Sequence, residues 1–594
     1  MTNELEASSE SESEPESTMQ QDPTRTADNR IRRGVRGGRG RGGRGNAGQG
    51  GRGGRTRGGS NVSTNNPVSV RQRQPALPWS TNPKTVQPFP FKNTPGITKG
   101  MSSDAIELDY FKLFMTTELI EMIVVETNRY AAEIRAKVPD DKPHARIRSW
   151  KEVTSDSIWR MIALTIAMGI TKKPTIDSYW STKAVWQTKF FGSVMSRNRY
   201  KVILQSLHFQ NNQLNKPEGD RIWKLRPLYE MLTAKFTSVY VPEQDISIDE
   251  SLLLYKGRLF FKQYIPNKRS KFGIKSYELC ESRSGYTWKY SLYTGQDRTL
   301  LVGMHGSSYC IVMKLLDGLL HLGHRLAVDN YYNSPQLCSD LFDAQTNCLG
   351  TVRPNRVGMP SDLRLKPDGQ ELQKGEVIYR TMDKLMALCW LDRKYVNMLS
   401  NCNDEKLAET GKKDRDGQHI VKAQVIIDYN EIMGGVDRVD QLLQYYSFLR
   451  KSIKWYKKVA FHLFDVALLN SQILWMKAHP DAKMTGLEFR MTVVEQIIHK
   501  TGADPSASCK GGRPSGSVLP TRLTARHFPS LTPPTERRHV VFQQRRLCNK
   551  GMGRRHVAGD DRRRIETKVQ CTECGDIPLC SAPCFGLWHT EVDI

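Results

Sequence analysis

Apolar residues along this chain follow three successive patterns. Between residues 105 and 244 they recur at helical spacing, and residues 155–170 are apolar on most sides. This pattern predicts amphipathic helices and one buried helix that begins at a Ser/Asp cap. From residue 245 onward, short apolar segments are separated by turn sequences, which predicts strands. After Asp440 the helical spacing returns, and one long helical stretch is predicted to run toward His479.

The middle of the chain alternates strands with a helix. Strands are predicted at residues 246–254, 260–265, 275–281, 288–293 and 324–328. A helix is expected at residues 307–323, just before the last of these strands. Hairpin strands followed by a helix and a further strand are typical of an α/β core. Residues 357–422 have a weak pattern, with strand-like segments only at 384–390 and 395–400, and are interpreted as an insertion into that core.

Two stretches of the chain lack the apolar residues that a folded core requires. Residues 1–104 begin with an acidic Ser/Glu tract and continue into an Arg- and Gly-rich segment, so they are predicted to be disordered. Residues 505–544 are rich in Pro, Ser and Arg and are interpreted as a basic linker. No secretory signal is recognised, and residues 158–170 are shorter than the roughly 20 residues of a spanning helix. We therefore expect no membrane association.

Charge points to a nucleic acid as the partner. The chain carries a formal net charge of +26, which favours a polyanion. Four Arg-Gly-Gly triplets form an RGG box. Its arginines can bind phosphates and stack on bases with little sequence preference. These arginines are Arg36, Arg41, Arg52 and Arg57. The box is thus a candidate contact for DNA or RNA, although a solubilising spacer or a nuclear-import signal explains it as well.

Cysteines gather near the C-terminus. Of twelve cysteines, five lie between residues 548 and 584, and Cys571 and Cys574 have the spacing of a zinc-binding pair. The candidate zinc ligands are Cys548, His556, Cys571, Cys574, Cys580, Cys584 and His589. A segment this small gains its folding free energy from metal, about 10–16 kcal/mol of apparent binding energy for zinc. Residues 545–594 are therefore predicted to form a zinc finger.

Four aspartates adjoin apolar segments of the predicted core. Asp249 lies in the first predicted strand, and Asp329 directly follows the apolar run that ends at Val328. Asp437 and Asp440 are three residues apart, so on a helix they share one face. Two Mg²⁺ ions roughly 4 Å apart need several carboxylates that converge from distant parts of a chain. Taken singly, each aspartate also has an ordinary interpretation as a strand end, a turn cap or a helix cap.

Several long motifs resemble the piggyBac family of DNA transposases. They are SIDESLLLYKGRLFFKQYIPNKRSKFGIK (247–275), VDNYYNS (328–334), GTVRPNR (350–356) and YNEIMGGVDRVDQ (429–441). The resemblance implies an RNase H-like catalytic core in two parts, residues 245–356 and 423–446, separated by the insertion. It also implies that residues 105–244 and 447–504 form one helical dimerisation and DNA-binding domain. The expected fold is therefore multi-domain α/β.

The resemblance also assigns roles to single residues. Asp249, Asp329 and Asp437 match the three metal-binding aspartates of the family, which implies Mg²⁺ or Mn²⁺, and Asp440 matches a fourth acidic residue beside them. Candidate phosphate contacts are Lys268, Arg269, Lys271 and Lys275 in the basic stretch after the first strand, and Trp455 matches a family tryptophan that lies close to DNA.

The C-terminal segment departs from the family pattern. The family has a cross-brace finger that binds two zinc ions and begins with Cys-x-x-Cys. Here Gly551 stands where the second cysteine is expected after Cys548. His556 is a candidate substitute, so the chain is expected to bind either one or two zinc ions, and the finger is expected to contact either DNA or a protein tail.

By this resemblance the chain is expected to act in the nucleus as a homodimer. It would bind the terminal repeats of a transposon in double-stranded DNA, cut and join strands, and insert at TTAA sites. A second hypothesis is a domesticated relative that binds DNA or chromatin without transposing. A third, an RNA-binding protein led by the RGG box, explains only the first hundred residues.

Overall fold

The computed structural model describes residues 78–83, 87–266, 268, 270–295, 306–364, 372–413, 417–508, 527–533, 543–544, 566–574, 576–579 and 584–590. The RGG arginines Arg36, Arg41, Arg52 and Arg57, the basic-stretch residue Arg269 and the candidate ligands Cys548, His556 and Cys580 lie outside these residues. Cys584 begins a helix, but its side chain is outside the description.

The last part of the predicted N-terminal tail is folded, so the expected boundary at residue 104 is wrong. The rings of Phe89 and Phe342 pack edge-to-face with centroids 4.9 Å apart. Strand β1 (Gly96–Ile97) pairs antiparallel with strand β2 (Tyr240–Val241). Isolated aromatic residues in a Pro-rich segment have no periodicity, which is why the sequence pattern did not indicate that they pack.

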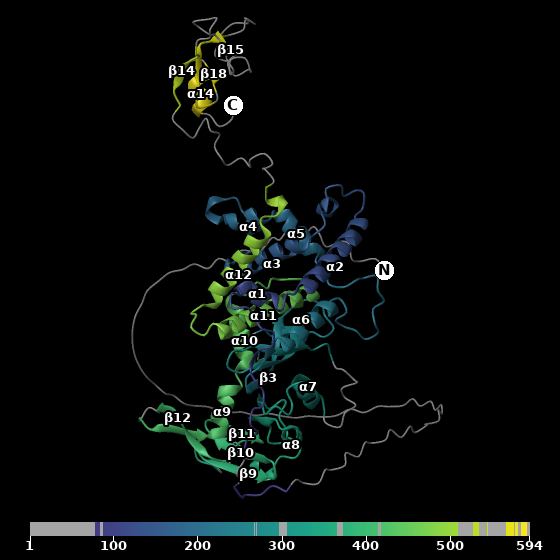
Figure 1. Cartoon of the computed structure of the whole chain (residues 1–594), viewed down its shortest axis with the longest axis vertical. Helices are drawn as coiled ribbons and strands as arrows, with labels where there is room; N and C mark the ends of the chain where they lie inside the picture. Colours follow the sequence, from purple (N-terminus) through teal and green to yellow (C-terminus); the bar gives the residue numbers. More distant parts are fainter. Residues whose placement is uncertain are drawn as a thin grey trace, which may run out of the picture. The chain divides into compact units, whose positions relative to one another are not determined.

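Two groups of helices, far apart in sequence, pack together (Figure 1). The first group comprises α1 (Glu107–Lys112), α2 (Thr117–Ala136), α3 (Ser155–Ile170), α4 (Lys189–Val194), α5 (Arg197–Ser206) and α6 (Arg226–Ser238). The second group comprises α11 (Trp455–Ala478) and α12 (Gly486–Thr501). Helix α12 packs against α3, and α11 packs against α1 and α6.

Polar side chains define where several of these helices begin. The hydroxyl of Thr154, rather than the predicted Ser/Asp cap, accepts the N–H of Ser157 at the start of α3. Ser196 accepts an N–H at the start of α5, and Thr485 and Glu488 form a capping box at the start of α12. Each such cap contributes about 1 kcal/mol to helix stability.

Charged side chains make buried contacts between α3 and the end of α12, and between α11 and α12. Arg160 of α3 donates a 2.9 Å hydrogen bond to the carbonyl of Gly502, just after the end of α12. Asp465 of α11 and Arg490 of α12 form a buried ion pair, with 2.8 Å between Oδ1 and Nη1. Burial raises the pKa of Asp465 to about 6, and the charge of Arg490 opposes this increase. The pair therefore holds two core helices together where neither charge contacts water.

The predicted helical stretch from Asp440 to His479 is interrupted. Helix α10 (Gly435–Tyr445) ends well before α11 begins at Trp455. The connecting segment passes across α3 at Gly169, where an added Cβ would lie 2.2 Å from the carbonyl oxygen of Tyr446. This close approach fixes the segment in a non-helical path, a tertiary contact that periodicity along the sequence does not reveal.

Helix α11 is long and apolar enough to cross a membrane by length and composition alone. The sequence pattern had indicated no such stretch. In the structure 83% of its most apolar window is buried inside the protein, and its polar residues include the paired Asp465. The helix is therefore a core helix of this fold.

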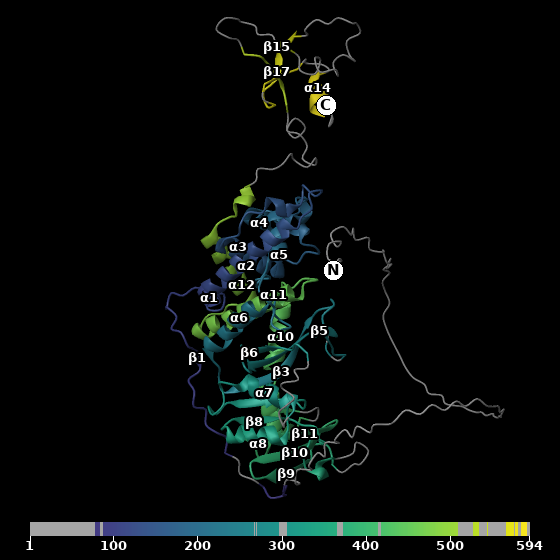
Figure 2. The same cartoon turned by 90° about the vertical axis from the view of Figure 1, so that its right-hand side faces the viewer.

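A mixed sheet of nine strands lies between the two helical groups in sequence (Figure 2). Its strands are β3 (Asp245–Leu254), β4 (Gln263–Tyr264), β5 (Phe272–Glu281), β6 (Thr287–Leu292), β7 (Arg325–Val328), β8 (Asn347–Thr351), β9 (Val377–Met382), β10 (Leu385–Leu391) and β11 (Tyr395–Ser400). Strand β3 is antiparallel to β5 on one side and parallel to β7 on the other, and β7 is parallel to β8.

Two of the predicted elements around this sheet are shorter than expected. The strand expected at residues 260–265 is reduced to β4, and the helix expected at 307–323 ends as α7 (Ser307–Leu316). Gly318 follows that helix with a φ of +93°, a backbone conformation that glycine adopts without strain and that does not continue a helix.

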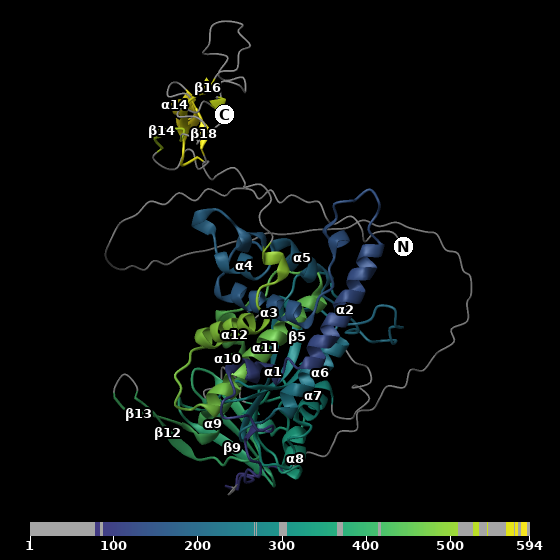
Figure 3. The ribbon, with the colours of Figure 1, turned by 45° about the horizontal axis from the view of Figure 1, so that its top comes forward.

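The region interpreted as an insertion contributes strands to the same sheet. Strand β11 pairs antiparallel with β8, and β10 and β9 follow it outward. Strands β12 (Leu407–Lys413) and β13 (His419–Ala423) form a separate hairpin (Figure 3). The chain then enters α9 (Gln424–Ile432) and α10. The strand segments at residues 384–390 and 395–400 are therefore an extension of the core sheet.

The C-terminal part contains small strands and one short helix. They are β14 (Pro529–Leu531), β15 (Gln543–Gln544), β16 (Glu566–Thr567), β17 (Val569–Cys571), β18 (Ile577–Pro578) and α14 (Cys584–Thr590). Strand β14 lies within the predicted basic linker, yet it pairs with β17. The boundary expected at residue 545 is therefore wrong, because a strand of three residues is too short to show a pattern in an Arg- and Ser-rich segment.

Replacing Arg490 by Met should destabilise the helical part by about 3–5 kcal/mol, because it leaves the buried carboxylate of Asp465 without a partner. The double variant Asp465→Leu/Arg490→Met should regain most of this loss, since it removes both charges. Urea unfolding followed by tryptophan fluorescence measures the difference. Equal losses in the single and double variants would contradict the assigned role of the pair.

Candidate active site and C-terminal metal centre

Asp249 lies on β3, between the antiparallel and parallel halves of the sheet. The register places Ile248 beside Val328, so Asp249, within β3, adjoins Asp329, which follows the end of the parallel strand β7. The Oδ1 atom of Asp249 accepts a 2.7 Å hydrogen bond from the N–H of Glu250. Burial raises the pKa of Asp249 to about 7, and the negative charges of Glu250 and Asp329 add to this increase.

Asp329 organises a tight turn after β7. Its Oδ1 atom accepts the N–H of Tyr331 at 2.9 Å, while its carbonyl accepts the N–H groups of Tyr332 and Asn333 at 3.2 and 3.1 Å. Burial raises the pKa of Asp329, and the N–H of Tyr331 partly offsets that shift. The carboxylate is therefore fixed by backbone donors, and no side-chain cation is bonded to it among the described residues.

Asp437 and Asp440 lie on α10, which packs against β3 and β5. The hydroxyl of Ser251 on β3 donates a 2.7 Å hydrogen bond to Oδ1 of Asp440. Burial raises the pKa of Asp440, and the charge of Asp437 raises it further. Gly435 permits this packing, because a Cβ there would lie 2.5 Å from Oγ of Ser247.

Glu278 is a further acidic residue of the site that the sequence pattern did not single out. It lies on β5 directly opposite Asp249 and is 1% exposed. The hydroxyl of Ser276 donates a 2.7 Å hydrogen bond to it, and burial raises its pKa to about 8, with Asp440 as the next cause. The alternation of side chains along a strand could have indicated this residue. Residues two apart on a strand point to the same face, so Glu278 lies on the same face of β5 as Ser276.

Two of the predicted phosphate contacts lie beside these acidic groups. The ammonium of Lys268 donates a 3.0 Å hydrogen bond to the carbonyl of Glu250, and its charge lowers the pKa values of Asp249 and Asp440. Lys275 is half-buried, with its Nζ 3.8 Å from Oε2 of Glu250. Both lysines therefore partly neutralise the carboxylates.

The other two described candidates lie elsewhere. Lys271 is exposed on the approach to β5. Trp455 is half-buried at the start of α11, and its ring packs edge-to-face against Phe261 with centroids 5.4 Å apart. Trp455 is thus at least partly a packing residue.

The donor atoms of this acidic site fit a divalent cation. Asp249, Asp329 and Asp440 are half-buried carboxylates whose pKa values are raised by loss of solvent, so the protein alone does not fully compensate their charges, whereas Asp437 is exposed. Oxygen atoms of this kind are the ligands that Mg²⁺ prefers. The four predicted aspartates do not gather as tightly as a preformed metal cage, however, since the described residues contain a tighter group only near the C-terminus.

That tighter group consists of His527, Cys571, Cys574 and His589, whose ligand atoms all lie within 4.8 Å of one another. Nδ1 of His527 lies 3.4 Å from the Sγ atoms of both cysteines, and Nε2 of His589 lies 3.4 Å from Sγ of Cys574. The other ring nitrogen of His589 is 2.7 Å from the carbonyl of Phe585, which orients the imidazole toward the cysteines. Two sulfur and two nitrogen ligands suit one tetrahedral metal ion.

Three predicted ligands, Cys571, Cys574 and His589, are thus brought together, and His527 is a ligand candidate that the sequence pattern missed. It lies 44 residues before Cys571, in the segment interpreted as a linker. A lone histidine at such a distance gives no spacing signal.

The chain has clear relatives among known proteins. Residues 107–472, more than half of the chain, match the family model described as Transposase IS4. The chain therefore belongs to this family of transposases, and within it to the piggyBac transposases, as the sequence motifs predicted. PiggyBac transposable element-derived protein 3 of Homo sapiens is 26% identical over 459 residues, which cover 75% of this chain and 73% of the relative.

Two further comparisons agree. PiggyBac transposable element-derived protein 2 of Homo sapiens is 27% identical over 435 residues, which cover 70% of this chain and 69% of the relative. The fold is similar to a cryo-EM structure of the piggyBac transposase synaptic complex with hairpin DNA, with a TM-score of 0.60 and 24% identity. That similarity covers 69% of this chain and 83% of the other. The mixed α/β fold is thus that of a piggyBac transposase.

Replacing Gly435 by Ala should destabilise the protein by about 1–3 kcal/mol, because the new methyl group overpacks the contact between α10 and β3. Urea unfolding measures the loss. Gly434→Ala is a matched control, since nothing lies within 4 Å of a Cβ at that position. Combining Gly435→Ala with Ser247→Ala should recover part of the loss. Equal stability of the Gly434 and Gly435 variants would show that the approach of α10 is not tight.

Proposed function

We propose that this chain is a DNA transposase that cuts and joins phosphodiester bonds at transposon ends and inserts at TTAA sites. The observation that carries the proposal is the convergence of carboxylates from three separated segments. Asp249 on β3 adjoins Asp329 after β7, and Asp440 on α10 is bonded to Ser251 of β3. The order of antiparallel β5 and β6, central β3, and parallel β7 and β8 supports an RNase H-like core.

The carboxylates would hold the divalent cations. Asp249, Asp329 and Asp437 are proposed as ligands of Mg²⁺ or Mn²⁺, and such ions supply activation of the attacking oxygen and neutralisation of the leaving oxygen. The N–H groups of Glu250 and Tyr331 each occupy one carboxylate oxygen and so fix the orientation of Asp249 and Asp329.

Residues around these ligands would position the site. Ser251 holds Asp440 against β3, which fixes the face of α10 that carries Asp437. Lys268 lies near enough to lower the pKa values of Asp249 and Asp440, and so favours their ionised forms. Burial and the charge of Asp440 raise the pKa of Glu278, so this carboxyl favours its protonated form until a bound cation balances the charges beside it.

The proposed partner is double-stranded DNA carrying terminal repeats. Support comes from the structural relative, which is a transposase complex with hairpin DNA, and from the net charge of +26. The helical part, residues 105–244 and 447–504, is proposed to bind DNA and to form a homodimer, and the site of action is the nucleus. Contacts of Lys271, Arg269 and Trp455 with DNA, and of the RGG arginines with DNA or RNA, belong to the same proposal.

A second candidate function is binding to DNA or chromatin without transposition. It is favoured by the two human relatives, which are named as proteins derived from a transposable element. The retention of all four aspartates favours the first candidate.

We further propose that the C-terminal centre binds zinc. Its ligand set of two cysteines and two histidines is one used by structural zinc sites. The remaining predicted ligands, Cys548, His556, Cys580 and Cys584, are sufficient in number for a second ion of a cross-brace.

Replacing Asp249, Asp329 or Asp437 by Ala should lower strand cleavage by several orders of magnitude and leave binding of end DNA nearly unchanged. Removal of a ligand loses a cation and its catalytic contribution, whereas a lost negative charge does not weaken attraction to DNA. Asp440→Ala should be milder. The measurement is cleavage of a labelled transposon end flanked by TTAA, with Mg²⁺ or Mn²⁺, beside a gel-shift on the same fragment.

The matched control is Asp317→Ala, an exposed aspartate just after α7. If the wild-type protein cuts and Asp249→Ala cuts equally well, the assigned catalytic site is wrong. If the wild-type protein binds ends but never cuts them, the second candidate function is favoured.

Replacing His527 by Ala should remove one zinc ion per chain, because it takes one of four ligands from the tightest site. Metal analysis of full-length protein purified without chelator measures the stoichiometry. His499→Ala, on α12, is the control and should keep the full zinc content. A wild-type protein without zinc would refute the centre, and loss of a second ion in His556→Ala would establish the cross-brace.

A further inference from the structure

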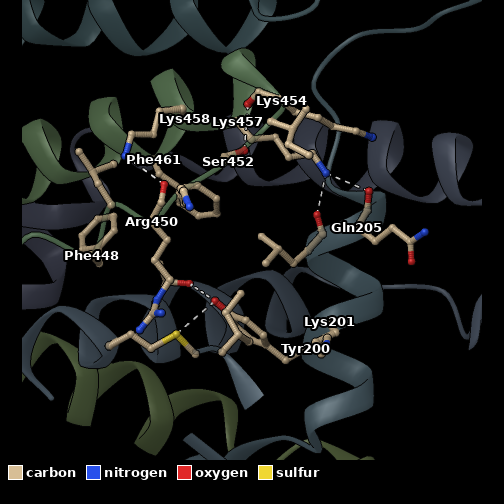
Figure 4. Close-up of a pocket in the computed structure, with 17 residues that line it drawn as sticks. Tyr200, Lys201, Gln205, Phe448, Arg450, Ser452, Lys454, Lys457, Lys458 and Phe461 are labelled. Atoms are coloured by element: carbon tan, nitrogen blue, oxygen red, sulfur yellow. Dashed lines mark hydrogen bonds between the residues drawn. The ribbon is translucent and has the colours of Figure 1, made fainter. Parts of the chain in front are cut away.

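A cavity of about 430 Å³ lies between the two helical groups (Figure 4). It is bounded by α3, α5, the segment connecting α10 to α11, and the first turns of α11. Its apolar lining includes Met168, Ile176, Leu204, Phe448 and Phe461. This volume falls in the range of sites for small organic ligands, about 300–1,000 Å³.

Positive charge surrounds this apolar lining. The cationic residues of the cavity are Lys201, Arg450, Lys451, Lys454, Lys457 and Lys458, and no acidic residue lines it in the described part of the chain. Of these cations only Lys201 forms an ion pair among the described residues, with Asp177. The other five basic side chains of the cavity therefore have no carboxylate partner in the described part of the chain.

The buried lysines of the cavity are bonded to neutral groups. Lys457 donates hydrogen bonds of 2.6 and 2.9 Å to the carbonyls of Leu204 and Gln205, and Lys458 donates one of 3.0 Å to the carbonyl of Arg450 (Figure 4). Burial lowers the pKa values of both lysines. An anion in the cavity would stabilise their charged forms, so the protein alone leaves this charge only partly balanced.

The cavity also contains the start of a long helix. Lys454 is the N-cap of α11, and no side chain caps its first N–H groups. The positive end of a helix dipole adds to the lysines there. Lys451 and Ile453 are exposed at this rim, so a ligand can enter from solvent. An apolar interior with a cationic rim suits a flat apolar group joined to a phosphate.

We propose that this cavity binds one unpaired nucleotide of a DNA strand. The base lies among Leu204, Phe448 and Phe461, and the phosphate lies at Lys451, Lys454 and the start of α11. A base within a duplex is stacked on both faces and cannot enter, so the site selects a nucleotide that has left the stack. That the strand is DNA rests on the proposed function, whereas the preference for a base joined to a phosphate rests on the cavity itself.

The test measures binding alone, so that it is independent of cleavage. A duplex with one unpaired 2-aminopurine nucleotide at its end is compared with the same duplex fully paired, using the full-length protein. The wild-type protein should bind the unpaired form more tightly and change its 2-aminopurine fluorescence. Leu204→Trp, which fills the cavity, should weaken binding of the unpaired form by about five- to hundredfold, the range of one stacked base.

Charge variants give a second measurement should Leu204→Trp fail to fold. Lys451→Glu and Lys454→Glu should weaken binding of the unpaired duplex more than binding of the fully paired duplex. Lys483→Glu is the matched control, because Lys483 is exposed beyond the opposite end of α11, a helix of 24 residues and so about 36 Å long. This control should leave the preference for the unpaired form unchanged.

Competitors separate the sources of the ligand. Competition by free deoxyadenosine monophosphate supports a nucleotide site that also accepts a free nucleotide, and competition only by oligonucleotides supports one that requires the strand. Equal binding of the paired and unpaired forms by the wild-type protein would overturn the proposal. So would competition by inorganic phosphate or poly-glutamate as effective as that by the nucleotide. If the protein cuts DNA ends but does not prefer the unpaired form, the proposed function stands and the proposed nucleotide site is wrong.

Discussion

Helix α10 lies close enough to β3 for the hydroxyl of Ser251 to reach Asp440 at 2.7 Å, and glycine at position 435 permits this approach. The contact brings acidic groups together where burial raises the pKa values of Asp440 and Glu278, and the charge of Asp440 raises that of Glu278 further. Such an arrangement is costly for a protein alone, and the packed core of α10, β3 and β5 has to hold it. The acidic site is therefore a property of the whole sheet and its covering helix.

The sequence was sufficient to place residues whose neighbours show strong periodicity. Asp249 and Asp329 adjoin apolar strands, and the strand expected at residues 395–400 coincides with β11. The long motifs supplied the family, which the comparisons confirm. Local periodicity was therefore sufficient to predict single strands, and the long motifs were sufficient to predict the family.

Contacts between distant segments were beyond that kind of inference. Glu278 became visible as a site residue only through its register with Asp249 on the neighbouring strand. His527 required β14 to pair with β17, and the interruption before α11 required the close approach at Gly169. In each case the deciding partner lies far away in the sequence, and its identity depends on the tertiary fold.

The division of the helical part into two segments has a consequence for how the chain folds. Arg160 and its partner carbonyl at Gly502 are 342 residues apart. During synthesis the helices of the first group therefore emerge long before α11 and α12, which pack against them. The residues of the sheet are synthesised between the two groups. Contacts of such high sequence separation slow folding. The apolar helix α11 is synthesised after the helices of the first group against which it packs. Until it packs there, its own apolar surface and the apolar surface of the first group remain exposed, so both can aggregate or bind chaperones.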